Sequence, residues 1–179
     1  MAAILEVGLD RDKECEIVAG QPEEKVVGGA RHGGVGSRLI GELWMHVKAR
    51  RLGSVYGPDT SFQIGQNQRI PDVAFIAAER IPLEGEPQGP WPMPPDLAVE
   101  IVSPTDLHEK LMAKIAEYLA AGVRQVWRIS PEHRTVAIHS SPTEVKILSE
   151  TDELDGGHVI PGFRCRVAEL FRGPIPPPS

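Results

Sequence analysis

The pattern of hydrophobic and polar residues is most informative over residues 94–130. This stretch contains an apolar strand at Leu97–Val102, a Ser-Pro break, an amphipathic helix, and a second strand at Arg124–Ile129 that follows Gly122. Strands that are apolar at nearly every position are typical of the buried part of a sheet. The stretch therefore predicts the centre of an α/β fold.

Short strands and a further amphipathic helix are predicted outside this stretch. The helix spans residues 32–51 and places Val35, Leu39 and Val47 on one face. Residues 66–68 are predicted as a turn. Segments that alternate like strands lie at residues 15–22, 23–27, 54–56, 60–65, 69–76, 133–140 and 144–148, the last two as a hairpin. Together these elements predict a mixed central sheet flanked by helices, with an added β-hairpin.

The length of 179 residues suggests one domain with a substantial core. We expect this domain to span residues 15–172. Residues 1–14 show no clear period and are predicted as a flexible leader. The Pro-rich residues 173–179 are predicted as a disordered tail.

Two carboxylates stand in or at the start of apolar strands. Glu100 lies within Leu97–Val102, and Asp72 follows Pro71 at the mouth of the strand before it. A charge in an apolar strand needs a partner or a metal, because desolvating it alone is costly. Strands joined by a loop are commonly neighbours, so the two carboxylates can converge. Two carboxylates with open water positions are an ordinary way to hold Mg²⁺, and such an ion can polarise a phosphate.

Two lysines follow on the central helix. Lys110 and Lys114 share a helix face, and Lys114 borders the apolar stripe that includes Leu111 and Ile115. Its stem can pack against this stripe while its ammonium group reaches a site. Lys114 is therefore the candidate for stabilising charge on a phosphate or orienting a water molecule.

Each of these residues also has a structural interpretation. Asp72 can cap a loop at the start of its strand, and Glu100 can form a buried structural ion pair. Lys114 can be a solvated helix lysine, and His32 fits an amino-terminal helix position better than a metal ligand. No Gly-x-Ser-x-Gly motif surrounds Ser103, so a serine hydrolase is not indicated.

Charge and cysteine content narrow the classes of function. The net charge of −6 argues against tight, metal-free DNA binding but leaves room for an enzyme whose basic residues are local. Cys15 and Cys165 lack metal-like spacing, so we expect reduced thiols in a cytoplasmic protein. No apolar run reaches the length of a membrane helix, and no membrane partner is expected.

Three ordered segments carry a resemblance to a known family. They are PDVAF at 71–75, PDLAVEIVSPTD at 95–106 and EKLMAKIAEYLAAGVRQVWRISP at 109–131. With PGFRCRVAELF at 161–171, they resemble the Uma-type family of restriction endonucleases, which is assigned to the PD-(D/E)xK nuclease superfamily. The resemblance extends from about Glu16 to Phe171. It implies a restriction-endonuclease-like fold and a divalent-metal-dependent endodeoxyribonuclease.

The same resemblance implies roles for individual residues. Asp72 and Glu100 would hold Mg²⁺ or Mn²⁺, with the Ile101 carbonyl as a third ligand. The common superfamily pattern has a lysine two residues after the glutamate, where this chain has Val102. The family resembles members whose lysine lies on the following helix, which assigns the catalytic lysine to Lys114.

The resemblance leaves other features of the site open. Superfamily members often add an acid from the first helix or nearby, and Glu23, Glu24 and Glu42 are the candidates here. The implied substrate is DNA, and a homodimer is expected because cutting a duplex needs two active sites or two passes. The alternative is a catalytically inactive nucleic-acid-binding or assembly module that keeps the nuclease fold.

Overall fold

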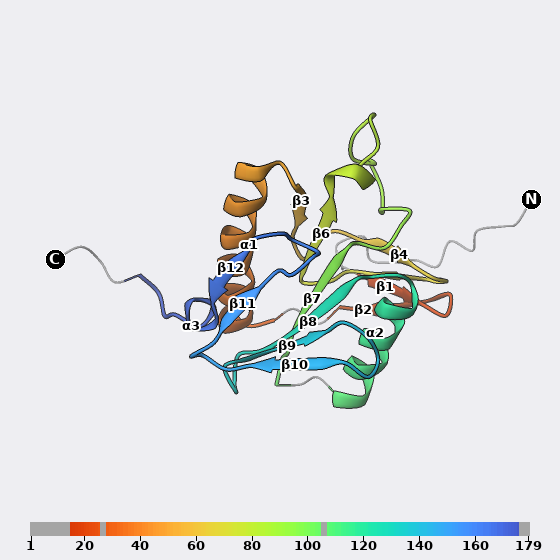
Figure 1. Ribbon diagram of the computed structural model, residues 1–179. Coiled ribbons are helices and arrows are strands. Elements are labelled where there is room, and N and C mark those ends of the chain that lie inside the picture. The colour runs from red at the N-terminus through yellow and green to blue at the C-terminus, as the bar shows by residue number, and fades with distance from the viewer. Residues whose placement is uncertain (1–14, 26–27, 105–106, 176–179) are drawn as a thin grey trace, which may run out of the picture.

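A six-stranded mixed sheet lies at the centre of the computed structural model, which describes residues 15–25, 28–104 and 107–175 (Figure 1). Its strands run in the order β10-β9-β8-β7-β6-β3. β7 and β8 are parallel, and the other neighbouring strands are antiparallel. The strands are β3 (Gly53–Tyr56), β6 (Val73–Ala77), β7 (Leu97–Ile101), β8 (Gln125–Ser130), β9 (Thr135–His139) and β10 (Val145–Leu148). The predicted mixed sheet and the added β9–β10 hairpin are therefore confirmed.

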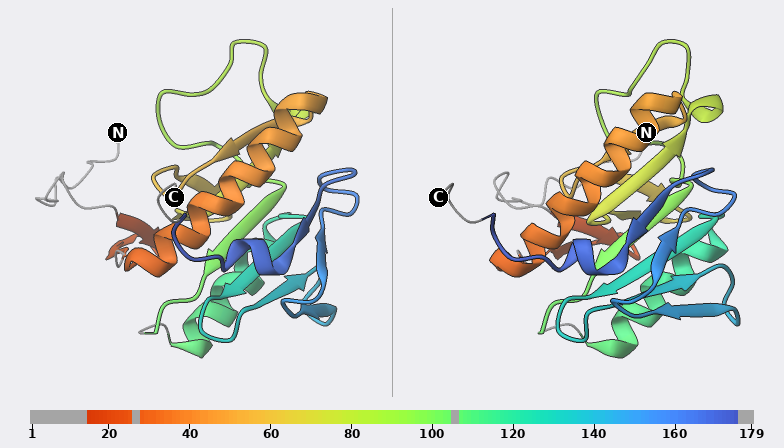
Figure 2. Two further views of the ribbon diagram at one scale, coloured as in Figure 1. Left: turned by 90° about the vertical axis from the view of Figure 1, so that its left-hand side faces the viewer. Right: turned by 60° about the vertical axis from the view of Figure 1, so that its left-hand side comes forward.

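Two helices cover opposite faces of this sheet (Figures 1 and 2). The long α1 (Ala30–Arg50) lies on one face, and α2 (His108–Ala120), which connects β7 to β8, lies on the other. Successive side chains of a strand point to opposite faces, so a strand with helices on both sides is buried throughout. In β7, Val99 packs on the α1 side and Ala98 on the α2 side. Glu100 follows this alternation toward α2.

The amino-terminal half of α1 approaches the sheet closely at a glycine. Gly36 is buried, and a Cβ atom at this position would lie 3.3 Å from Cδ1 of Ile101. The absence of a side chain therefore lets α1 pass close to the carboxyl end of β7. Gly36 costs helix propensity, and the packing of Val35, Leu39 and Leu43 against the sheet offsets that cost. Among the described helices, none combines the length and the apolarity needed to cross a bilayer.

A second sheet, in the order β2-β1-β5-β4, packs beside the first (Figure 1). Its strands are β1 (Cys15–Val18), β2 (Gln21–Glu24), β4 (Phe62–Ile64) and β5 (Asn67–Arg69). The predicted turn at residues 66–68 is wrong, because Asn67–Arg69 pairs with Phe62–Ile64 as a strand and the turn falls at Gly65 and Gln66. Gly65 has a φ of +59°, which glycine adopts without strain.

The carboxyl-terminal elements pack on the α1 side. They are β11 (Glu153–Asp155), β12 (Arg164–Arg166) and α3 (Val167–Leu170). The Arg38 Nε atom on α1 donates a 2.8 Å hydrogen bond to the Leu170 carbonyl, which ties α3 to α1. The predicted leader at residues 1–14 and the last part of the predicted tail, residues 176–179, lie outside the described residues.

Glycine substitutions test the packing at the edge of the sheet. Gly53 begins β3 at a φ of +148°, and a Cβ atom there would lie 2.0 Å from the Ile76 carbonyl oxygen. We expect Gly53→Ala to lower the free energy of unfolding by at least ~2 kcal/mol, because the pairing of β3 with β6 must shift. Gly41→Ala, on the exposed face of α1 with open space around it, should raise it by roughly 0.5–1 kcal/mol. Urea denaturation measures both, and equal effects of the two substitutions would contradict this packing.

Candidate active site

The pairing of β6 with β7 brings Asp72 and Glu100 to the same end of the two strands. The ladder ends where Val73 lies opposite Val99, and the two carboxylates are the next residues outward on each strand. The Asp72 amide donates a 2.9 Å hydrogen bond to the Val99 carbonyl, and one Asp72 carboxylate oxygen, Oδ2, accepts a 2.7 Å hydrogen bond from the Ile101 amide. Asp72 is therefore fixed by the backbone of β7 as well as by its own strand.

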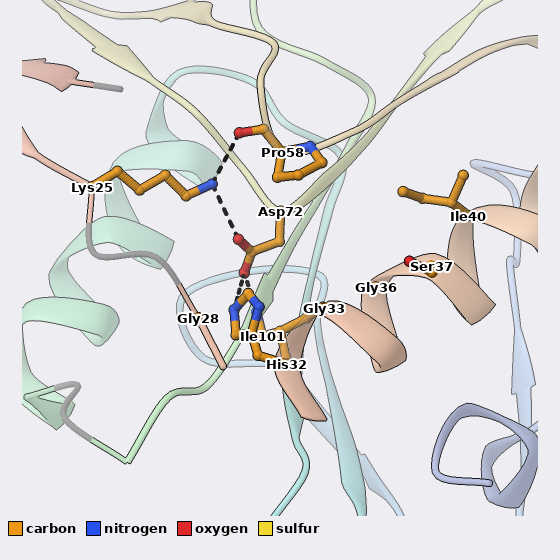
Figure 3. Close-up of a pocket in the computed structure, with 10 residues that line it drawn as sticks. All are labelled: Lys25, Gly28, His32, Gly33, Gly36, Ser37, Ile40, Pro58, Asp72 and Ile101. Carbon is orange, nitrogen blue, oxygen red and sulfur yellow. Dashed lines mark hydrogen bonds and ion pairs between the residues drawn. The ribbon is translucent and has the colours of Figure 1, made fainter. Parts of the chain in front are cut away.

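Two basic side chains contact Asp72 from different elements (Figure 3). Lys25, which follows β2, places Nζ 3.1 Å from Oδ1 and also donates to the carbonyls of Ile70 at 2.9 Å and Pro58 at 3.3 Å. His32, in the first turn of α1, places Nε2 3.2 Å from Oδ2. No local pattern marks Lys25 as a site residue, and His32 is predicted only as a helix residue. Both contacts depend on the tertiary arrangement.

These contacts keep Asp72 ionised. Burial alone would raise the pKa of Asp72, but the hydrogen bond from His32, the charge of Lys25 and the Ile101 amide outweigh it and lower the pKa to about 2. The hydrogen bond to Asp72 raises the pKa of His32, against the opposing effect of burial. The carboxylate is thus a negative charge available at neutral pH.

Glu100 points toward α2, where it meets Lys114 and Tyr118. Its Oε1 atom lies 2.9 Å from Lys114 Nζ and accepts a 2.8 Å hydrogen bond from the Tyr118 hydroxyl. Lys114 and Tyr118 are four residues apart on α2 and share the face that packs on the sheet. Glu100 contacts both Lys114 and Tyr118 through the same oxygen, Oε1. Lys114, with 15% of its side chain exposed, is held in this ion pair and is not a solvated helix lysine.

A third carboxylate, Glu16 of β1, completes the group. Its Oε1 atom lies 2.8 Å from Lys114 Nζ and accepts a 2.9 Å hydrogen bond from the Ile70 amide, while Oε2 lies 2.9 Å from Arg69. Arg69 in turn binds Glu117 of α2 through Nε and a terminal nitrogen. Sequence analysis overlooked Glu16. A signal existed, because Glu16 stands among Cys15, Ile17 and Val18 as Glu100 stands within its own apolar strand.

The shared lysine affects the two glutamates differently. Burial raises the pKa of Glu100 and outweighs the attraction of Lys114. Burial acts in the same direction on Glu16, but Lys114, the Ile70 amide and Arg69 together lower its pKa. Burial alone would lower the pKa of Lys114, and the charges of Glu100 and Glu16 more than offset it, so this pKa is raised. Lys114 is therefore a firmly protonated ammonium group at neutral pH.

The acids predicted as additional ligands are exposed, and their role stays a prediction. Glu42 is exposed on α1, where its charge adds to the effect of burial in raising the pKa of the Cys165 thiol. Glu23 and Glu24 are exposed on β2, where Glu23 pairs across the ladder with Glu16. Glu16 is instead the acid that the structure brings to Lys114 and Glu100.

Several features of this group suit a divalent cation. Carboxylate and carbonyl oxygens are the ligands that Mg²⁺ prefers, and Asp72, Glu100 and the Ile101 backbone lie together at the strand ends. Within residues 15–25, 28–104 and 107–175, no cluster of three or more acidic, histidine or cysteine side chains is arranged as a ready metal site. The role of Asp72, Glu100 and Ile101 as metal ligands stays a prediction.

An open pocket of about 300 Å³ lies against Asp72. Its walls include the two basic residues that contact Asp72, Lys25 and His32, together with Ile101 of β7. The small residues Gly33 and Gly36 of α1 also line it (Figure 3). The glycines leave room beside the carboxylate, so a substrate group can reach Asp72 from the α1 side.

Comparison with known proteins identifies the family of this chain. Residues 3–168 match the sequence profile described as "Uma2: Putative restriction endonuclease". The chain belongs to the Uma2 family. Its structure is similar to the crystal structure of a "putative nuclease belonging to DUF820" from Anabaena variabilis, with a TM-score of 0.79 and 21% identity over 88% of this chain and 89% of that one. At this identity the similarity concerns the fold. A search of curated proteins finds no match.

Membership in the Uma2 family confirms the predicted family and the restriction-endonuclease-like fold. Restriction-endonuclease-like proteins generally use divalent metal ions and act on nucleic acid, so the family indicates an enzyme of this class. In this chain, Val102 occupies the position where many such nucleases have lysine, and it packs among the apolar residues on the α2 side. Lys114 reaches the same face of the sheet from α2.

Removing Lys114 tests the charge group without any substrate. In Lys114→Met, Glu100 loses its ammonium partner while staying buried beside Asp72 and Glu16. We expect the free energy of unfolding to fall by about 3 kcal/mol at pH 8. The pKa of Glu100 in the folded variant would lie further above its unfolded value, so the loss should shrink as the pH is lowered toward 5.

Lys110→Met is the matched control, because Lys110 lies one turn earlier on α2 and is exposed. Its effect should stay within about 0.5 kcal/mol at both pH values. Chemical denaturation at pH 5 and pH 8 measures each free energy of unfolding. A loss in Lys114→Met that does not depend on pH would contradict the assignment of a buried charge pair.

Proposed function

We propose that the protein is a divalent-metal-dependent endodeoxyribonuclease that hydrolyses phosphodiester bonds. The observation that carries the proposal is the reach of Lys114 from α2 to Glu100, next to Asp72 on the neighbouring strand. This arrangement supplies the acid, acid and lysine of the PD-(D/E)xK pattern although the lysine is displaced in sequence. Membership in the Uma2 family supports the same class of reaction.

Asp72 and Glu100, with the Ile101 carbonyl, would hold Mg²⁺ or Mn²⁺. When bound, such an ion supplies charge stabilisation at the phosphate and lowers the pKa of coordinated water. Asp72 is suited to this task because its pKa is lowered to about 2, so its carboxylate is ionised at neutral pH. The Glu100 carboxyl has a raised pKa, so the binding of a cation at neutral pH also favours its ionised form.

Lys114 acts as a charged donor. Because its pKa is raised, it keeps its proton at neutral pH and does not serve as the base that deprotonates water. Its ammonium group can instead orient the attacking water and stabilise negative charge on the phosphate as attack proceeds in line. Glu16 and Glu100 fix the position of the ammonium group, each within 3 Å of Nζ.

One observation favours the alternative of a catalytically inactive nucleic-acid-binding or assembly module. Both oxygens of Asp72 are in contact with basic groups, Lys25 at Oδ1 and His32 at Oδ2. A divalent ion must share or displace these partners, which weakens its binding. A carboxylate oxygen has two lone pairs, so sharing is chemically possible. The measurement of metal affinity separates the two functions.

Metal-dependent cleavage of supercoiled plasmid tests the proposed activity. Asp72→Asn and Glu100→Gln should each lower the cleavage rate by at least about a hundredfold, since each removes a charge from the site, and Lys114→Met should do so by a similar factor. Isothermal titration with Mn²⁺ should show weaker binding for the first two variants and retained binding for Lys114→Met.

Glu109→Gln is the control for these variants, because Glu109 is an exposed acid in the first turn of α2. It should cleave at the rate of the unchanged protein. Circular dichroism verifies that each variant is folded. Cleavage that survives in both Asp72→Asn and Glu100→Gln would overturn the proposed site, and folded protein without Mn²⁺ binding or cleavage would leave the binding module as the function.

We expect a homodimer on the basis of the proposed activity. A homodimer would place two copies of this site on the two strands of a duplex. This expectation, together with a cytoplasmic location, stays a prediction.

A further inference from the structure

We infer that an arginine-lined groove beside α1 binds the phosphodiester backbone of the DNA strand that enters the proposed active site. The inference rests on the proposed function and specifies where its substrate lies. Arg31 and Arg38 of α1 are the principal contacts. Arg134 and Arg172 line the opposite wall of the groove.

The amino-terminal half of α1 lies beside the carboxyl-terminal segment of the chain (Figure 2). Residues of both segments line the groove. Its volume is about 660 Å³. Four of the twelve residues that line it are arginines, and the acidic one is Glu132. The hydrogen bond from Arg38 to the Leu170 carbonyl holds the two walls together. The groove is therefore held in place by a hydrogen bond between its walls, and its lining carries a net positive charge.

The groove is continuous with the candidate active site around the start of α1. The pocket beside Asp72 and a second pocket of about 510 Å³ share His32. This second pocket shares Arg31 and Pro131 with the arginine-lined groove. A chain that occupies all three passes from Arg38 over Arg31 and His32 to Asp72. A DNA strand is such a chain, and its phosphates recur along it.

Charge favours phosphate as the ligand of this surface. In the described part of the chain, neither Arg31 nor Arg38 forms an ion pair, and Arg31 is exposed. Arg134 and Arg172 contact Glu150 and Glu169, so they contribute less free charge. The first turn of α1 carries no acidic residue, and the amino-terminal end of the helix dipole adds positive potential there. Guanidinium groups bind phosphate oxygens through paired N–H donors.

The groove also resolves a conflict with the overall charge. A net charge of −6 opposes the approach of a polyanion, so DNA binding by this chain needs a local surface of the opposite sign. Phosphate contacts of this kind position DNA and carry no sequence information. The inferred contacts therefore predict binding that depends on salt and is uniform across sequences.

Fluorescence anisotropy with a fluorescein-labelled 20-base-pair DNA duplex tests this surface. The full chain is titrated in EDTA at several salt concentrations, so that no cleavage takes place. For Arg31→Gln/Arg38→Gln we expect affinity to fall about tenfold at low salt, as for the loss of two charged contacts. The slope of log affinity against log salt should become shallower by about two.

Two further variants control for structure. Arg50→Gln removes a single arginine charge at the opposite end of α1, about 28 Å from Arg31 at 1.5 Å per residue, and should bind like the unchanged protein. Arg38→Lys keeps the charge while losing the Nε hydrogen bond to Leu170, so it should retain most of the salt slope. Thermal unfolding confirms that each variant is folded.

The outcomes separate this inference from the proposed activity. An unchanged affinity and salt slope in Arg31→Gln/Arg38→Gln would overturn the groove, even if plasmid cleavage requires Asp72 and Glu100. The same loss of affinity in Arg50→Gln would also overturn it. Reduced binding and slope confined to the Arg31 and Arg38 substitutions would support the groove, even if the chain cleaves no DNA with Mg²⁺ or Mn²⁺.

Discussion

The ammonium group of Lys114 between Glu100 and Glu16 is the interaction on which the arrangement of the site depends. Three elements meet at it: α2 supplies the lysine, β7 supplies Glu100 and β1 supplies Glu16. Buried charges of one sign repel each other strongly, and a single protonated lysine makes the two carboxylates compatible with burial. The second sheet is thereby joined to the central sheet at the point where Asp72 and Glu100 emerge.

The two faces of the central sheet differ in how they surround Glu100 and Asp72. On the α2 side, Lys114 and Tyr118 fix Glu100 and restrict its movement. On the α1 side, the glycines of the helix leave space beside Asp72, and the same helix continues past Arg31 and Arg38. The proposed chemistry therefore needs both faces: Glu100 is held on the α2 side, and Asp72 is reached from the α1 side, where the inferred DNA path lies. One strand pair, β6 and β7, connects them.

Much of the fold could be predicted from local pattern. The strands at Leu97–Val102 and Arg124–Ile129 and the long helix near residues 32–51 could be recognised because burial on one or both faces leaves a clear hydrophobic pattern. The strand at Asn67–Arg69 was missed because its three polar residues show no hydrophobic alternation. It forms through pairing with β1 and β4, which no local signal reports.

The sequence by itself determined the family, the fold class and the isolated charges in apolar strands that drew attention to Asp72 and Glu100. Such charges are conspicuous because burial of an unpaired charge is costly. Only the tertiary structure decided which partners they have. Lys25, His32 and Glu16 join the group from segments remote in the chain, and ion pairing across such separations leaves no local period. The arginines beside α1 likewise form one surface only after the carboxyl-terminal segment packs there.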